Sequence, residues 1–279
     1  MEENTTGKKL HYTLRLAAAM CFIGHGAFGI ITKQIWFNYF GVFGIPHDTA
    51  LTLMPVVGLI DILMGISLLI YPTRAILLWL VFWGLMTAAL RPLSGEPFAE
   101  FLERAGNYGA PLVLLFIHHK NNKKFPDWFK RITPDVSLDE RDRRTAMVLL
   151  QVIVFLLLAG HGWLNIMEKK GLLSQYATLG FSSPEMAARF VGIFEICTAT
   201  LILIKPYHSL VLLLFIWKMG SELFYPQMEI FEWIERGGSY GALLALWFIL
   251  YNRLQQVRGT ERKDSSPASV HGRGKLHLN

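Results

Sequence analysis

Two histidines and two acidic residues lie inside apolar stretches of the sequence, where they could exchange protons. His25 sits in FIGHGAFGI and His161 in LAGHGWLNI, and the apolar stretch that follows each of them carries one acid, Asp61 or Glu195. An ionisable side chain near the centre of a bilayer costs about 2.5–3.5 kcal/mol on insertion scales, so it normally faces a partner or water. We therefore expect His25 to pair with Asp61, which would orient and charge the imidazole. The alternative is a packing site, in which flanking glycines bring helices together around a hydrogen-bonded histidine.

A second group of polar residues is predicted to lie at a depth in the bilayer similar to that of the histidines. We assign this group to substrate binding. Its members are Arg91, Glu103, Arg104 and Tyr108 in the first half of the chain and Glu222, Glu235, Arg236 and Tyr240 in the second. Glu103 and Arg104 are neighbours on a predicted helix and point about 100° apart, so we do not expect them to pair with each other. We expect Glu103 to pair instead with a nearby arginine such as Arg91. Lys218 and Glu222 are spaced to neutralise each other across one helical turn. The alternative is an interfacial anchor for each Glu-Arg pair and simple packing for the tyrosines.

The elements that must position these residues are membrane-spanning helices. Hydrophobic residues make up 52% of the 279 residues and charged residues only 17%, against about 25% charged in a typical soluble domain. About 20 helical residues cross a bilayer core of roughly 30 Å. Stretches of that length predict eight spans, at 14–31, 54–71, 74–91, 101–118, 146–166, 187–204, 208–225 and 232–251. The fourth and eighth begin with charged residues, as if they entered the bilayer from a polar cavity.

Basic residues gather in three segments that flank these spans. They precede the first span, fill the connector at 119–145 and recur in the tail. An even number of spans separates the three segments, so the positive-inside rule places all of them, and both termini, in the cytoplasm. The net charge of +6 therefore reflects membrane topology, and nucleic-acid binding is excluded. The predicted domains are a cytoplasmic N-terminus at 1–13, membrane units at 14–118 and 146–251 joined by the basic connector, and a disordered basic tail at 252–279.

The two membrane units are copies of each other. FIGHGAFGI returns as LAGHGWLNI, PVVGLIDILMGISLLIYP as RFVGIFEICTATLILIKP, and LERAGNYGAPL as IERGGSYGALL, all in the same order. Because each copy holds an even number of spans, the second enters the membrane from the same side as the first. The predicted fold class is an all-α integral membrane protein with eight transmembrane helices, arranged as two parallel four-helix repeats.

The copies differ in charge at several matched positions. The differences are Gly84 against Lys218, Ala88 against Glu222, Arg91 against Tyr225 and Asn107 against Ser239. Two identical sites are therefore not expected. We expect one working pocket beside one that has drifted, or two pockets with different tasks.

The four-span unit resembles the DoxX-like family of small membrane proteins, here duplicated. The resemblance rests on the Gly-His-Gly first span, the acid of the second span and Glu-Arg-x-Gly-x-Tyr-Gly opening the fourth, over roughly 14–118 and 146–251. Members of that family include a membrane subunit of a thiosulfate:quinone oxidoreductase, proteins tied to oxidative-stress handling, and others in secretory or maturation systems. The resemblance implies a redox link, but the cysteines, Cys21 and Cys197, form no Cys-x-x-Cys pair for sulfur chemistry.

The leading hypothesis is a redox-linked membrane protein, an oxidoreductase or its membrane subunit, that binds a small hydrophobic molecule in the outer half of the bilayer. The candidate cofactors are a quinone-like compound and haem. His25 and His161 would exchange protons or ligate the cofactor, while Asp61 and Glu195 would set their protonation. The arginines would bind an anionic or carbonyl oxygen of the ligand. Haem would take the two histidines as axial ligands, which requires them to face each other across the repeat axis.

Two other functions fit the sequence. Parallel repeats also build alternating-access transporters, so a carrier of a small solute or lipid is the first alternative. Discontinuous helices near the midplane would favour it, but Pro92, Pro111 and Pro226 lie near the ends of predicted spans. The second alternative is a non-catalytic assembly or cargo-binding subunit, in which the polar residues only hold the bundle together. The bilayer is the expected surrounding in every case, and a partner subunit fits the redox and assembly roles.

Overall fold

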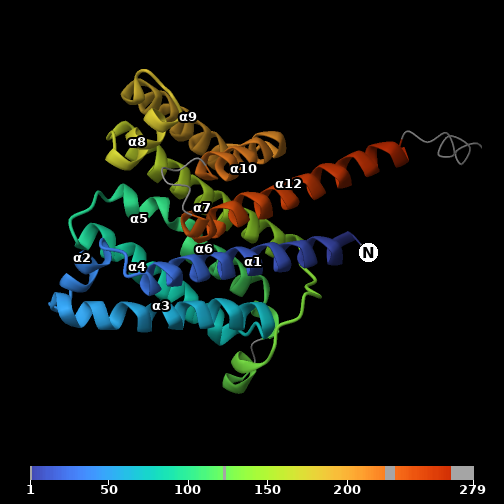
Figure 1. The fold of residues 1–279 in the computed structure, drawn as a ribbon. Coiled ribbons are helices and arrows are strands. Elements are labelled where there is room, and N and C mark those ends of the chain that lie inside the picture. Colours follow the sequence, from blue (N-terminus) through green and yellow to red (C-terminus); the bar gives the residue numbers. More distant parts are fainter. Residues whose placement is uncertain (1, 122–123, 224–229, 265–279) are drawn as a thin grey trace, which may run out of the picture.

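The computed structural model describes residues 2–121, 124–223 and 230–264, and within them the chain folds into helices (Figure 1). The long helices are α1 (Glu2–Ile30), α3 (His47–Ile70), α4 (Arg74–Leu93), α6 (Ala105–Ile117), α7 (Glu140–Ile166), α9 (Pro184–Ile204), α10 (His208–Leu223) and α12 (Gly237–Asp264). The shorter ones are α2 (Trp36–Gly41), α5 (Ala99–Glu103), α8 (Lys170–Thr178), α11 (Ile230–Glu235) and the 3-10 helices η1 (His119–Asn121) and η2 (Phe125–Phe129). The predicted all-α class is confirmed for these ranges.

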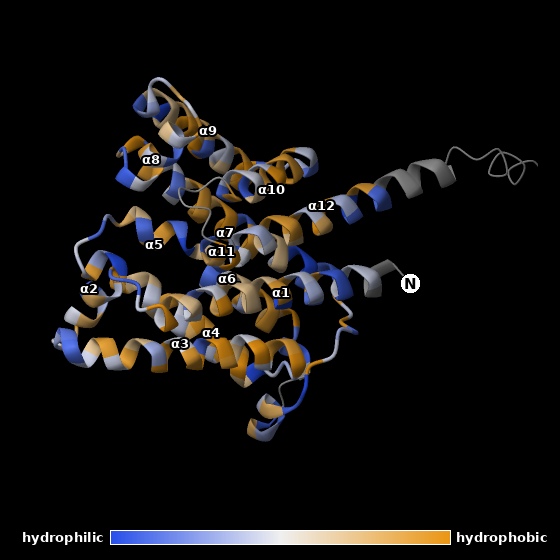
Figure 2. Cartoon of the chain, viewed as in Figure 1, coloured by the Kyte–Doolittle hydropathy of each residue, from blue (hydrophilic) through white to orange (hydrophobic). Residues whose placement is uncertain are grey.

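Five of the helices are long and apolar enough to cross a membrane. They are α1 from Thr5 onward, α3, α4, α7 and α9, and they match five of the predicted spans. Figure 2 shows hydrophobic residues along α3 and α4, and side chains such as Val56 and Leu63 of α3 are exposed while Asp61 on the same helix is buried. Large exposed apolar surfaces indicate contact with a membrane or with another protein. These helices indicate a membrane protein surrounded by lipid.

The other three predicted spans differ from these five. The span at 208–225 corresponds to α10, and its last residues, including Tyr225, lie outside the described ranges. The spans at 101–118 and 232–251 are not single helices, because the first is divided at Arg104 between α5 and α6 and the second at Arg236 between α11 and α12. Glycines follow each arginine in RAGNYG and RGGSYG. Glycine weakens a helix, so both helices break where the Glu-Arg pair lies.

The segments outside the predicted spans contain more helix than the sequence suggests. Helix α12 continues to Asp264, so the tail predicted as disordered at 252–279 begins as helix; the remainder, 265–279, lies outside the described residues. The connector at 119–145 holds η1, η2 and the start of α7, with 122–123 outside the described ranges.

Four long helices, two from each half of the chain, form the centre of the bundle. Helices α6 and α12 contact each other and both contact α1 and α7. Helices α3 and α4 lie on one side of this centre, and α9 and α10 lie on the other (Figure 1). The short helices α2, α5 and α8 lie at the end of the bundle opposite the N-terminus. That end also holds the polar residues singled out from the sequence.

Glycines set the close contact between α1 and α3. A Cβ atom at Gly26 would lie 2.4 Å from the carbonyl oxygen of Gly58, so the two backbones touch. Gly162 and Gly192 meet in the same way between α7 and α9, where a Cβ at Gly162 would lie 2.8 Å from the carbonyl oxygen of Gly192. Small residues allow such approach in membrane bundles. Each contact lies next to a histidine and holds it near the acid of the neighbouring helix.

Gly26→Val is expected to destabilise the protein by about 1–3 kcal/mol, the usual cost of overpacking, because the backbone of α3 leaves no space for the new side chain. Thermal unfolding of the purified protein in detergent, followed by tryptophan fluorescence, measures this loss. Gly220→Ala is the matched control, since a Cβ at this position of α10 meets no atom within 4 Å. The control variant should be at least as stable as the wild type, and an equal loss in both variants would contradict the role of the α1–α3 contact.

Candidate functional site

The predicted pair of His25 and Asp61 is present. Nδ1 of His25, on α1, lies 2.7 Å from Oδ2 of Asp61, on α3. Asp61 is fully buried, and within the described ranges its Oδ1 has no hydrogen-bond partner. The imidazole also packs against the indole of Trp36 in α2, with 4.7 Å between the ring centroids. The imidazole keeps 16% of its surface exposed, so this pair can reach a ligand.

The second histidine forms the matching pair but is held more tightly. Nδ1 of His161 lies 2.5 Å from Oε2 of Glu195. Asn165, one turn along α7, donates from Nδ2 to the carbonyl oxygen of His161 at 3.1 Å, and its own Oδ1 accepts a 2.7 Å hydrogen bond from the Tyr176 hydroxyl. Asn165 and Tyr176 were not among the residues predicted from the sequence. The position of Asn165 four residues after His161 is the signal that could have identified it.

Two predictions about the arginines are wrong. Arg91 binds Glu96 at 3.1 Å and Glu100 at 3.4 Å, not Glu103. Glu103 instead accepts hydrogen bonds from Arg236 at 2.7 Å and from its neighbour Arg104 at 3.2 Å. Because α5 ends at Glu103, the 100° spacing of residues along a continuous helix does not separate Glu103 from Arg104. The pairing with Arg236 joins the two halves of the chain, which spacing within one half could not predict.

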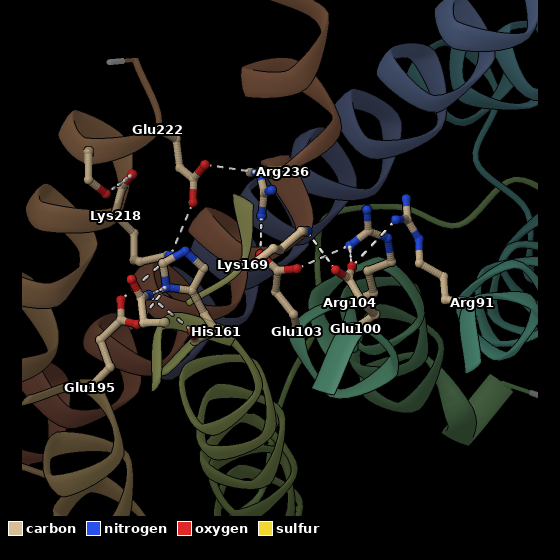
Figure 3. A network of polar contacts seen from close by, with 12 residues as sticks. Arg91, Glu100, Glu103, Arg104, His161, Lys169, Glu195, Lys218, Glu222 and Arg236 are labelled. Atoms are coloured by element: carbon tan, nitrogen blue, oxygen red, sulfur yellow. Dashed lines mark hydrogen bonds and ion pairs between the residues drawn. The ribbon is translucent and has the colours of Figure 1, made fainter. Parts of the chain in front are cut away.

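These ion pairs extend into a network that reaches the second histidine (Figure 3). From Arg236 the contacts continue to Glu222 at 3.0 Å, from Glu222 to Lys218 at 3.1 Å, and from Lys218 to Glu195 at 3.7 Å. The predicted pair of Lys218 and Glu222 is therefore confirmed. An uncompensated charge in a low-dielectric interior is costly, so each of these buried groups depends on its neighbours.

A cavity of about 260 Å³ lies beside the first histidine pair. Its polar lining includes His25, Thr87, Arg91, Arg104, Asn107 and Glu235. Its apolar lining comes from α2, α3, α4 and the segment after α2, and includes Trp36, Tyr39, Phe40, Val57, Trp83 and Leu90. Both halves of the chain contribute, because Glu235 belongs to α11. The cavity thus has an apolar, aromatic body and a charged end.

In the described part of the second half, the matching polar residues lie close together. The space between Glu103, Lys218, Glu222 and Arg236 has no room for a water molecule. Lys218 and Glu222 occupy it, whereas the matched positions in the first half are Gly84 and Ala88. The halves therefore differ as expected. Within the described residues, the first half holds an open cavity and the second a closed network of charges.

The remaining predicted residues are two tyrosines. Tyr108 and Tyr240 are buried, and neither lines the cavity. The ring of Tyr108 stacks on Phe101 at 5.8 Å between centroids, as the packing alternative expects. Two axial histidines of a haem would have to line one cavity, but the cavity at His25 does not include His161, which is bonded within its own half. The arrangement does not fit a haem held by both histidines.

Two further ion pairs join the halves, and neither was predicted from the sequence. Lys33, after α1, pairs with Glu232 of α11, and Lys169, after α7, pairs with Glu100 of α5 at 2.5 Å. The residues just before the two lysines, Thr32 and Glu168, both have left-handed backbone, with φ of 50° and 55°. The two turns therefore have matching conformations. Each directs a lysine toward an acid of the other half.

The comparisons with known proteins add no relative. No family model, curated protein or solved structure matches the chain.

Lys218→Met is expected to cost about 3–5 kcal/mol of stability, because it leaves the buried carboxylates of Glu195 and Glu222 without their lysine partner. Thermal unfolding in detergent and size-exclusion chromatography measure the loss. Lys205→Met removes an exposed lysine and serves as the control, with a change within about 0.5 kcal/mol. Adding Glu222→Gln to Lys218→Met should restore part of the loss. Equal stability of Lys218→Met and Lys205→Met would contradict the role of the buried network.

Glu96 gives a testable pH dependence outside the membrane spans. Burial alone would raise the pKa of its carboxyl, but Arg91 and a 2.5 Å hydrogen bond from the Tyr39 hydroxyl hold the pKa below its usual 4.5. The ionised carboxylate therefore stabilises the fold above pH 4.5, and this contribution is lost as the pH falls below 4.5 toward the lower folded pKa.

The stability difference between the wild type and Glu96→Gln should accordingly be constant above neutral pH and should shrink on acidification below pH 4.5. Melting temperatures in detergent across this range give the measurement. Tyr39→Phe, which removes one of the groups that stabilise the carboxylate, should show a weaker acid-dependent loss than the wild type. A difference that is the same at every pH would contradict this assignment.

Proposed function

We propose that this chain is a DoxX-like membrane protein whose first half binds a quinone-like small molecule and exchanges a proton with it. In this proposal the chain crosses the membrane eight times as two parallel four-helix repeats, with both termini in the cytoplasm. The observation that carries the ligand proposal is the cavity of about 260 Å³, which has His25, Arg91 and Arg104 at its charged end.

Matched contacts in the two halves support the duplication. A glycine contact, a histidine–acid pair and a helix break at an arginine occur in each half at corresponding positions. The two lysine ion pairs between the halves also correspond. Helices α6, α10 and α12 pack within the same bundle as the five long apolar helices, so we count them as the fourth, seventh and eighth spans.

The distribution of charge supports the orientation. The start of α1 and the end of α12 lie at the same end of the bundle in Figure 1, and the sequence near both is rich in lysine and arginine. Positive flanks of this kind stay in the cytoplasm. The cavity lies toward the opposite end, which places it in the outer half of the bilayer.

The lining of the cavity favours a ring compound with polar oxygens. Trp36, Tyr39 and Trp83 offer aromatic surfaces for a flat apolar ring, while Arg91 and Arg104 offer donors for a carbonyl or anionic oxygen. A volume of about 260 Å³ is small for a ligand pocket, so it suits the ring of a quinone and leaves a prenyl tail in lipid.

The proton chemistry follows from His25 and the acid behind it. Reduction of a quinone to a quinol takes two electrons and two protons; in this proposal a partner redox protein supplies the electrons. Asp61 orients the imidazole, and His25 passes one proton to the carbonyl oxygen that the arginines bind, takes up a second proton from the aqueous phase and passes that one on as well. The chain thus acts as a membrane subunit that binds the quinone and delivers protons.

A transporter is the second candidate, and one observation favours it. The helix breaks at Arg104 and Arg236 lie next to the cavity and the charged network, and carriers commonly bind substrates at discontinuous helices. In that case the cavity would pass its ligand across the membrane without proton chemistry at His25. Movement of the ligand into sealed vesicles that depends on the protein would favour the carrier.

The quinone proposal is tested by titrating the purified protein with a decyl-substituted benzoquinone while following tryptophan fluorescence, since Trp36 and Trp83 line the cavity. Saturable quenching is expected. His25→Asn should weaken binding about tenfold, equivalent to about 1.4 kcal/mol, while His161→Asn should change it less than about twofold. Mass spectrometry of organic extracts of the purified protein should also detect a bound quinone.

Thr87→Phe tests the cavity itself. Thr87 lines the cavity, so a larger side chain there should fill it and abolish saturable quenching without loss of the folded protein. Quenching that does not saturate in the wild type, or that both histidine variants reduce equally, would contradict the proposal.

A further inference from the structure

A second cavity, of about 430 Å³, lies at the other end of the bundle and is separate from the site described above. It is formed where α4 begins, where α6 ends and where the connector folds back along them. The residues that matter for its chemistry are Arg74, His118, Lys120, Asp127, Lys130 and Arg131. Four of these six are cations and one is a carboxylate. The cavity is therefore strongly basic.

The connector is fixed in place around this cavity. The backbone of Arg131 forms an antiparallel bridge with Thr73, and the Ile132 amide donates to the carbonyl oxygen of Pro72 at 2.9 Å. The Thr73 hydroxyl in turn caps α4 by accepting from the Ile76 amide at 3.2 Å. The cavity is thus built by folded backbone and is not an accidental gap between side chains of a loose loop.

The cations of the cavity have unequal partners. Lys130 pairs with Asp127 at 2.8 Å, and Lys120 pairs with Asp139 at 2.7 Å. Arg74, only 4% exposed, donates to the carbonyl oxygens of His118 and Asp127, both at 3.1 Å. Within the described ranges neither Arg74 nor Arg131 has a carboxylate at ion-pair distance. Asp127 and Asp139 are thus paired with lysines, and Asp127 acts on Arg74 only from beyond ion-pair distance.

A third arginine strengthens the positive field. Arg15 of α1 donates to the carbonyl oxygens of Leu68 and Leu69 and lies close enough to Arg131 for the two cations to repel each other. Like charges held together in this way raise the energy of the empty site, and an anion that binds there relieves the repulsion. The planar guanidinium fork matches the oxygens of a phosphate group.

We propose that this basic cavity binds a phosphate group, with Arg74 at its base and Arg131 at its rim. The group belongs either to the head of an anionic membrane lipid or to a soluble phosphate compound. The inner leaflet, where we place this end of the bundle, carries anionic lipids that attract basic segments. The cavity has room for a head group.

The test uses the full-length protein in detergent, with thermal stabilisation and native mass spectrometry as readouts. The probes are phosphatidylglycerol, phosphatidylcholine, glycerol 3-phosphate and inorganic phosphate. Arg131→Gln removes the exposed one of the two arginines that have no carboxylate at ion-pair distance in the described part of the chain, and Arg144→Gln removes an exposed cation of α7 that does not line the cavity. Arg74→Gln serves as a second variant, since loss of its bonds to two carbonyl oxygens is expected to weaken the fold.

Saturable binding of at least one probe is expected, with about tenfold weaker affinity in Arg131→Gln and an unchanged affinity in Arg144→Gln. Binding of phosphatidylglycerol without glycerol 3-phosphate identifies a lipid head group, and binding of glycerol 3-phosphate or inorganic phosphate identifies a soluble ligand. Absence of saturable binding by any probe, or an equal loss in Arg131→Gln and Arg144→Gln, would overturn the proposal. Neither result depends on the quinone cavity, because the two cavities share no lining residue.

Discussion

The ion pair between Glu103 and Arg236 connects the two halves of the chain at the point where both are most polar. Charged groups cannot remain alone in the apolar interior of a membrane bundle, so every acid there requires a nearby base. Glu103 finds its strongest partner across the centre of the bundle, at 2.7 Å. The need to pair buried acids with bases accounts for the position of α5 and α11, for the helix breaks after them and for the order of the central helices.

The same requirement accounts for the different interiors of the two halves. In the second half, Lys218 and Glu222 fill the interior with charges that satisfy Glu195 and Arg236. In the first half, small residues at the matched positions leave the interior open, and His25 faces a cavity. The described charges of the second half thus balance one another, while the first half keeps a partly exposed histidine beside a cavity.

The sequence predicted those features that depend on one helix or on two consecutive apolar helices. The pair of His25 and Asp61 could be predicted because the two residues lie at similar depths in two consecutive helices. The pair of Lys218 and Glu222 could be predicted because the two residues are one helical turn apart. The partners of Glu103 and Arg91 could not be predicted in this way, because they depend on a helix break and on contacts between distant segments. The aromatic walls of the cavity were missed too, since α2 is short and nothing in its sequence indicates that it folds against α1 and α3.

The exchanged lysine pairs have an evolutionary consequence if the chain arose by duplication, as we propose. Lys33 reaches an acid of the second half, and Lys169 reaches the equivalent acid of the first. A single-copy ancestor could form neither contact within itself, but two copies related by a twofold axis could form both. The ancestral protein would then have been a homodimer with two identical sites, and fusion of its genes freed one site to close while the other kept its ligand.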